Sequence, residues 1–133
     1  MVVDTNVAVY LILHTQPFHE EVSQFWASLR TAAAPAHWQA EFAQVVWMAA
    51  RAGILRGEEA AARLELAAQL PVASEPLVPL WRGAMRRSIE TGVAVYDTLF
   101  VELASQRGCP LATFDGELLR KFPAIARRPA ALM

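Results

Sequence analysis

Short apolar segments alternate along this chain with longer amphipathic ones, and this alternation limits the possible folds more than any other feature. Segments such as 1–3 and 111–113 have the length and apolar content of short buried strands. Segments such as 17–29 and 37–52 repeat apolar residues at the spacing of a helix with one buried face. Strands joined by helices form parallel sheets through right-handed crossovers, with helices on both faces. The sequence therefore predicts one α/β domain over residues 1–133, with a central parallel sheet of four to five short strands flanked by about seven helices.

Turn and capping residues set the expected boundaries of these elements. Pro17 suits the first position of a helix, and Gly53 and Gly92 suit the position just after a helix end. Ser74, Glu75 and Pro76 together are typical of a helix start. We expect the four tryptophans to lie mostly in the core. The expected strands are 1–3, 31–36, 72–73, 111–113 and 125–127, and the expected helices are 7–13, 17–29, 37–52, 57–70, 76–91, 97–107 and 117–122.

The chain contains only three aspartates, Asp4, Asp97 and Asp115, and each stands where an apolar segment meets a predicted helix. Taken singly, an aspartate at such a junction is most often a helix cap. Three together favour a shared role, because the carboxyl ends of parallel strands meet at the edge where open α/β sheets bind ligands. Glu41, on the margin of the apolar face of helix 37–52, is a fourth candidate, and a solvated glutamate is its alternative interpretation.

Four carboxylates gathered at one edge predict a bound metal ion. Carboxylates only a few ångströms apart repel one another, so they need either raised pKa values or a divalent cation between them. Oxygen ligands without histidine or cysteine favour magnesium, with manganese as the alternative. Such a site suits hydrolysis of a phosphodiester bond by a metal-activated water molecule.

Several polar residues near these acids have two interpretations each. Thr5, Asn6 and Thr113 are candidates to orient ligands and water, and local turn hydrogen bonds are the alternative. His37 lies one helical turn before Glu41 and could contact the site, but a helix-start or surface histidine is the preferred interpretation.

Composition narrows the remaining classes of protein. The longest apolar run, residues 7–13, is too short to cross a bilayer, and no export signal is evident. A single cysteine excludes an internal disulfide. We therefore expect a cytoplasmic protein. A net charge of −1 argues against a uniformly basic nucleic-acid binder. Eleven of the twelve basic residues are arginine, which suits phosphate contacts. Arg86 and Arg87 could contact RNA, although a solvated helix face is the preferred interpretation.

The chain resembles the PIN-domain ribonucleases, and within them the VapC-type toxins of bacterial toxin–antitoxin pairs. The resemblance covers essentially the whole chain, and its most specific part is the Tyr-Asp helix start. The segments that carry it are Asp4-Thr5-Asn6, Glu41, Tyr96 to Ala104, and Thr113-Phe114-Asp115.

The resemblance implies a function and a set of site residues. Asp4, Glu41, Asp97 and Asp115 would form an acidic magnesium site, supported by Thr113 and Asn6. The protein would be an endoribonuclease that cuts single-stranded or looped RNA, forms a homodimer, and is held inactive by a small antitoxin protein lying along an apolar groove.

Three other classes of protein are alternatives to a toxin nuclease. A response-regulator receiver also gathers acids around magnesium, but it needs a lysine at a late strand end, and the only lysine, Lys121, falls inside the last predicted helix. A PIN-domain nuclease that processes RNA without an antitoxin, and a catalytically inactive PIN-like binding module, both fit the sequence.

Overall fold

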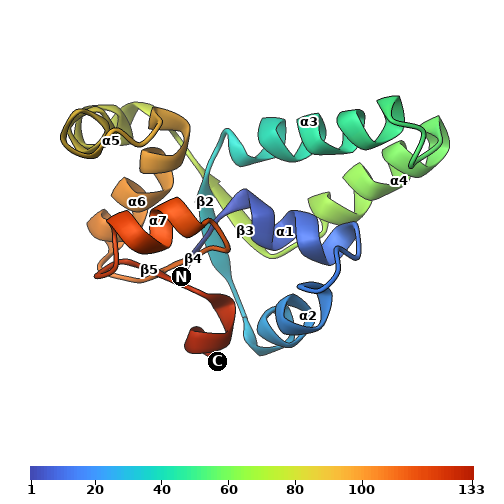
Figure 1. Ribbon diagram of the computed structural model, residues 1–133, viewed down its shortest axis with the longest axis horizontal. Coiled ribbons are helices and arrows are strands. Elements are labelled where there is room, and N and C mark those ends of the chain that lie inside the picture. Colours follow the sequence, from blue (N-terminus) through green and yellow to red (C-terminus); the bar gives the residue numbers. More distant parts are fainter.

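The computed structural model describes residues 1–133, and at its centre lies a sheet of five strands in the order β3-β2-β1-β4-β5 (Figure 1). Every neighbouring pair of strands is parallel. The direction of travel across the sheet reverses between β1 and β4, which is the topological switch point where such sheets bind ligands. The predicted α/β class and parallel sheet are confirmed. The strands are β1 (Val2–Val3), β2 (Ala32–Pro35), β3 (Val72–Glu75), β4 (Leu111–Ala112) and β5 (Ala126–Arg127).

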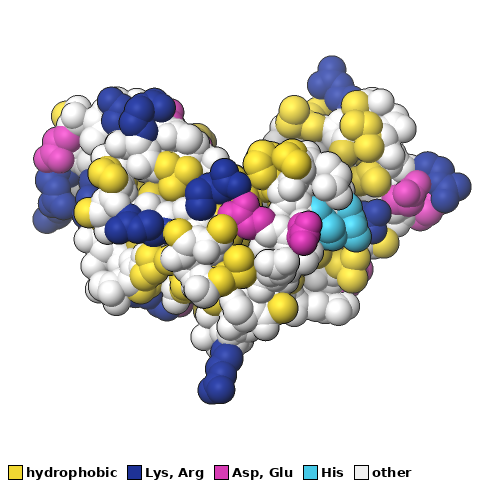
Figure 2. All heavy atoms as spheres, turned by 60° about the horizontal axis from the view of Figure 1, so that its bottom comes forward, with side chains coloured by type: hydrophobic (Ala, Val, Ile, Leu, Met, Phe, Trp, Pro, Cys, Tyr) yellow, Lys and Arg dark blue, Asp and Glu magenta, His cyan; other side chains and the backbone are white.

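Seven α-helices and a final 3₁₀ turn surround the sheet (Figure 1). The helices α1 to α4 pack against one another, whereas α5 packs on α6, which itself contacts β1, β2 and β4. Figure 2 shows a notch between the lobe of α5 and α6 and the lobe of α3 and α4. The helices are α1 (Thr5–Ile12), α2 (His19–Ser28), α3 (Trp38–Arg51), α4 (Gly57–Ala68), α5 (Val78–Thr91), α6 (Val95–Arg107), α7 (Gly116–Lys121) and η1 (Pro129–Leu132).

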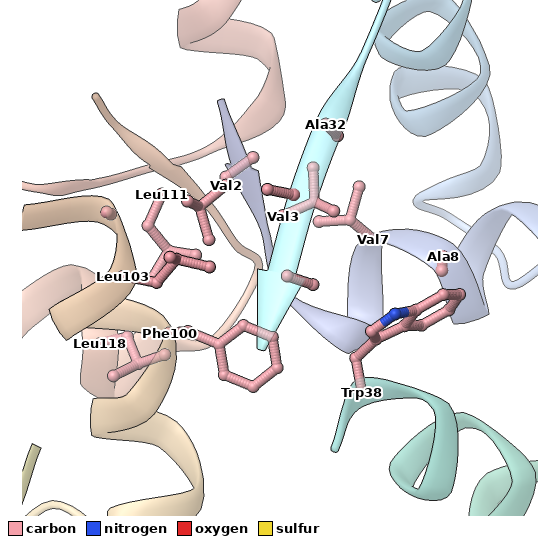
Figure 3. Close-up of a cluster of buried hydrophobic side chains, with 14 of the residues drawn as sticks. Val2, Val3, Val7, Ala8, Ala32, Trp38, Phe100, Leu103, Leu111 and Leu118 are labelled. Carbon is pink, nitrogen blue, oxygen red and sulfur yellow. The ribbon is translucent and has the colours of Figure 1, made fainter. Parts of the chain in front are cut away.

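A continuous hydrophobic core fills the space on both faces of the central strands. Phe100 and Leu103 of α6 lie on one side of β1 and β2, and Val7 of α1 lies on the other (Figure 3). The alanines of β2 are buried even though alanine has little strand preference. A strand that is covered on both faces needs apolar residues more than residues with a high strand preference, which explains how the alanines of β2 fit the centre of the sheet.

Some predicted boundaries are wrong. Ser74 and Glu75 do not start a helix: they end β3, which pairs with β2 over four residues, and α5 begins at Val78. Pro17 is not the first residue of a helix, because α2 begins at His19. The first helix begins at Thr5, earlier than predicted, with Asp4 as its N-cap.

A buried ion pair joins α5 to α6. The Arg87 Nε–H donates to Glu102 Oε2 at 2.9 Å, and the Gln106 amide donates to the other carboxylate oxygen at 3.2 Å. A Cβ atom on Gly83 would overlap the Glu102 carboxylate, so the absence of a side chain there leaves room for the ion pair. The prediction of a solvated face at Arg87 is therefore wrong, since its side chain is only 19% exposed.

Two groups of large apolar side chains remain exposed. Trp47 and Trp81 are about half exposed, so the prediction of mostly buried tryptophans holds only for Trp26 and Trp38. Hydrophobic side chains gather on the lobe of α3 and α4 in Figure 2. None of the helices has the length and apolar character needed to cross a bilayer. The α3–α4 surface comprises Trp47, Met48, Ile54, Leu64 and Leu66, and the α5 surface comprises Val78, Trp81, Met85 and Ile89.

Candidate active site

The register between β1 and β4 places Asp4 beside Thr113. Val2 pairs with Leu111 and Val3 with Ala112, so the next residues of the two strands are neighbours at the carboxyl edge. The Asp4 amide donates to the Ala112 carbonyl at 2.9 Å, and the Thr113 hydroxyl donates to Asp4 Oδ2 at 2.7 Å. Both side chains are buried. The carboxylate of Asp4 is therefore fixed in position by the sheet itself.

Asp4 also caps α1, which is the structural interpretation that the sequence offered for this residue. Its Oδ1 accepts a hydrogen bond from the Thr5 amide at 2.7 Å. The pKa of Asp4 is raised from 3.8 to about 7. Burial is the largest cause and the charges of Asp97 and Glu41 add to it, while the hydrogen bonds from Thr113 and Thr5 oppose the shift. Because burial and like charges disfavour the charged form of this carboxylate, a cationic partner would stabilise it.

Asn6 links the two strand ends. Its side-chain amide donates to Asp4 Oδ2 at 3.3 Å and to the Thr113 hydroxyl at 3.4 Å. Its carbonyl oxygen accepts from the Phe114 amide at 3.2 Å. The structure thus places Asn6 and Thr113 as supports of Asp4, where the sequence had left local turn hydrogen bonds as an alternative.

Glu41 reaches the same region from the first turn of α3. The Thr5 hydroxyl donates to Glu41 Oε1 at 2.7 Å, which ties α3 to the start of α1. Trp38 and Phe42, on either side of Glu41 in the sequence, are buried and hold this end of the helix against the core. Glu41 is therefore oriented by a specific contact and is not simply a solvated helix residue.

Asp97 and Asp115 complete the set of acids. Asp115 caps α7 through its Oδ1, which accepts from the amides of Glu117 at 2.8 Å and Leu118 at 3.1 Å. Asp97 stands in the first turn of α6 and does not cap it, because Ala94 occupies the cap position. The pKa of Asp97 is raised from 3.8 to about 6, chiefly by burial and in part by the nearby charges of Asp115 and Glu41.

All four acids line one pocket of about 340 Å³ at the carboxyl edge of the sheet. The elements that supply them are the ends of β1 and β4 and the first turns of α3 and α6. No three carboxylate, imidazole or thiol groups are already arranged as ligands of one ion. The oxygen-only set is nevertheless the chemistry that hard divalent cations prefer, and these four side chains could hold one. The full lining is Asp4, Thr5, Asn6, Val9, Tyr10, Glu41, Val45, Asp97 and Asp115.

Two features of the site are not evident from the sequence. His37 was expected at the surface, but its side chain is only 10% exposed. Its Nε2 lies 3.7 Å from Glu41 Oε1. Tyr10 forms part of the pocket wall and stacks on Phe18, with ring centroids 4.7 Å apart. The spacing of His37 one turn before Glu41 was the only sequence signal for either residue, because the burial of both rings depends on how the helices pack.

Comparison with known proteins gives a consistent result. Residues 1–124 match the PIN domain family. The chain is 36% identical over 126 residues to a protein named Ribonuclease VapC3 from Mycobacterium tuberculosis. The matched segment covers 93% of this chain and 88% of that protein.

Solved structures show the same fold at low sequence identity. Mycobacterium tuberculosis VapC20, described as a sarcin–ricin loop cleaving toxin, superposes with a TM-score of 0.71 at 18% identity, covering 91% of this chain and 94% of that chain. VapBC2 from Rickettsia felis, solved bound to a DNA fragment from its promoter, gives a TM-score of 0.66 at 16% identity, with 96% of each chain covered. The match in fold, the family match over most of the chain and the identity to VapC3 agree: this chain is a PIN-domain protein of the VapC family.

Proposed function

We propose that this protein is a magnesium-dependent endoribonuclease that acts in the cytoplasm as the toxin of a type II toxin–antitoxin pair. The observation that carries the proposal is the meeting of four carboxylates, Asp4, Glu41, Asp97 and Asp115, in one pocket at the switch point of the sheet. Relatives named as a ribonuclease and as a sarcin–ricin loop cleaving toxin support the choice of RNA as substrate.

The donor set of the pocket fits magnesium, with manganese as the alternative. The four carboxylates would hold the ion, which would supply a Lewis acid to polarise a phosphodiester oxygen and lower the pKa of a bound water molecule. Thr113 and the Thr5 amide fix the Asp4 carboxylate, and the Thr5 hydroxyl fixes Glu41. The protein's own contribution is to hold these oxygens ready before the substrate arrives.

Cleavage of RNA by the purified protein tests the activity. We expect wild-type protein to cut RNA with magnesium and to lose activity with a chelator, and Asp4→Asn and Asp97→Asn to be inactive in both conditions. Glu20→Gln, an exposed substitution on α2, is the matched control and should cut like wild type. Equal cleavage by wild type and both aspartate variants would assign the activity to a contaminant or to another site.

We propose that the antitoxin covers the groove between α3 and α4. An apolar pocket of about 270 Å³ opens there, lined by residues that include Trp38, Phe42 and Leu64. Leu64 is 42% exposed, which is costly for a large apolar side chain without a partner. The toxin–antitoxin complexes among the structural neighbours support a protein partner of this kind. An amphipathic segment of a small antitoxin would bury these side chains.

Growth and binding assays test the antitoxin. Induced expression should arrest bacterial growth, and co-expression of a small neighbouring reading frame should relieve the arrest. Leu64→Glu should abolish binding of that partner while cleavage of RNA continues. An active nuclease that neither arrests growth nor binds such a partner would favour an RNA-processing enzyme.

We further propose that the protein forms a homodimer through the exposed face of α5. Its surface residues Trp81, Met85 and Ile89 are between 50% and 78% exposed and follow one face of the helix. A second copy of the same face would bury all of them at once, as expected for a two-fold interface. Ile89→Glu should convert the dimer to a monomer in sedimentation equilibrium, whereas Ile54→Glu, at the equally exposed turn after α3, should not. A wild-type monomer at micromolar concentration would contradict the proposal.

A further inference from the structure

His37 occupies an unusual position between two elements of the candidate site. It is the N-cap of α3, and its ring packs on Phe100 of α6 with centroids 4.9 Å apart. Its side chain is 10% exposed, so the ring is enclosed between the start of α3 and the start of α6. Glu41 and Asp97 come from these two helix starts.

The ring of His37 makes a hydrogen bond that crosses from the start of α3 to the start of α6. The Glu41 amide donates to the His37 carbonyl at 3.0 Å, and His37 Nε2 lies 2.8 Å from the Tyr96 carbonyl oxygen. A carbonyl only accepts hydrogen bonds, so Nε2 carries the proton. The Tyr96 carbonyl belongs to the peptide plane that continues to the Asp97 amide, and that plane is rigid. The ring of His37 therefore ties the start of α3, which carries Glu41, to the peptide that precedes Asp97 in α6.

The side chain of Glu41 is held by Thr5 and lies beside the ring of His37. Its Oε1 accepts from the Thr5 hydroxyl at 2.7 Å and faces His37 Nε2 at 3.7 Å. Both contacts involve Oε1, and Glu41 also lines the pocket. A shift of His37 would therefore change the position of α6 and also the setting of Glu41.

The other ring nitrogen, Nδ1, is buried without a hydrogen-bond partner. An unsatisfied buried nitrogen is unfavourable, and an apolar side chain would pack against Phe100 without it. Packing alone therefore does not account for a histidine here, whereas the bond from Nε2 to Tyr96 does.

We propose that His37 is a positioning residue that sets Glu41 and Asp97 at the separation needed for both to bind one divalent cation. This inference rests on the proposed metal-dependent function. It assigns His37 no contact with substrate, so its effect on cleavage passes through the two acids.

A pair of amide substitutions tests this role. In His37→Gln the side-chain amide nitrogen lies at the reach of Nε2, whereas in His37→Asn it lies at the reach of Nδ1. We measure Mn²⁺ binding by the electron paramagnetic resonance signal of the free ion, cleavage of RNA, and thermal unfolding. We expect His37→Asn to weaken Mn²⁺ binding and cleavage by roughly 10- to 100-fold, the range for residues that orient metal ligands. His37→Gln should stay within a few-fold of wild type.

His14→Asn is the matched control, since His14 is exposed and lies outside the pocket, and it should leave Mn²⁺ binding unchanged. Each variant is assayed below its own unfolding temperature, and His37→Ala replaces His37→Asn if the latter does not fold. Equal Mn²⁺ affinity of wild type, His37→Gln and His37→Asn would overturn the positioning role while leaving the nuclease intact. Equal weakening of His37→Gln and His37→Asn would also overturn it, because the position of the donor would then not matter. Failure of wild type to bind Mn²⁺ would instead refute the proposed function and this inference together.

Discussion

Replacing Asp4 by asparagine should stabilise the metal-free protein at alkaline pH while abolishing its activity. The Asp4 side chain is buried, and its pKa is raised from 3.8 to about 7. Between these two pKa values the folded state binds a proton that the unfolded state has released, so the free energy of unfolding falls as the pH rises. Each unit of pKa shift is worth about 1.4 kcal/mol, so ionised Asp4 destabilises the fold by about 4 kcal/mol in total.

Asparagine removes this charge but also changes the hydrogen bonds. Asp4 Oδ2 accepts hydrogen bonds from the Thr113 hydroxyl and the Asn6 amide. An amide nitrogen in place of this oxygen would not accept them, which would lower the free energy of unfolding by about 1–3 kcal/mol. That cost is nearly the same at every pH. The difference in free energy of unfolding between Asp4→Asn and wild type should therefore rise by about 3 kcal/mol from pH 5 to pH 8.

Urea unfolding of both proteins in a chelator, at several values between pH 5 and pH 8, measures this difference. Glu20→Gln should show a difference from wild type that stays flat over the same range. Added magnesium at pH 8 should stabilise wild type and not Asp4→Asn, because only the wild type retains the site. If the difference between Asp4→Asn and wild type did not change with pH, Asp4 would not be the buried titrating group described here.

Three other outcomes follow from the structure. Magnesium must displace protons from Asp4 and Asp97, whose pKa values are about 7 and about 6, so apparent metal affinity should fall roughly twentyfold from pH 8 to pH 6; a flat titration profile would contradict this. Gly83→Ala should cost about 1–3 kcal/mol in urea unfolding, because the new Cβ displaces Glu102 from its ion pair. The same change in a Glu102→Ala background should cost much less, and an equal cost in both backgrounds would exclude the steric explanation. Phe42→Ala should cost about 3–5 kcal/mol, since the ring is 1% exposed; a loss below about 1 kcal/mol would show that the pocket beside it collapses to fill the gap.

Local patterns in the sequence determine much of this protein. Apolar segments ending in an acid predicted that Asp4 and Asp115 follow strands, and the structure places them at the ends of β1 and β4. Alternation of strands and helices was enough to predict a parallel sheet, because right-handed crossovers leave few other arrangements. The carboxyl edge of that sheet is then the expected place for Asp97 and Glu41 as well, and all four acids line one pocket there.

Only the tertiary structure decides the features that depend on distant partners. Ser74 and Glu75 look like a helix start, yet they extend β3 because the exposed backbone groups of β2 pair with them. His37 looks like a surface histidine until Tyr96 and Phe100, which are far along the chain, enclose its ring. Local sequence sets which conformations a segment prefers, but these preferences are weak, so burial and strand pairing in the tertiary structure decide which conformation forms.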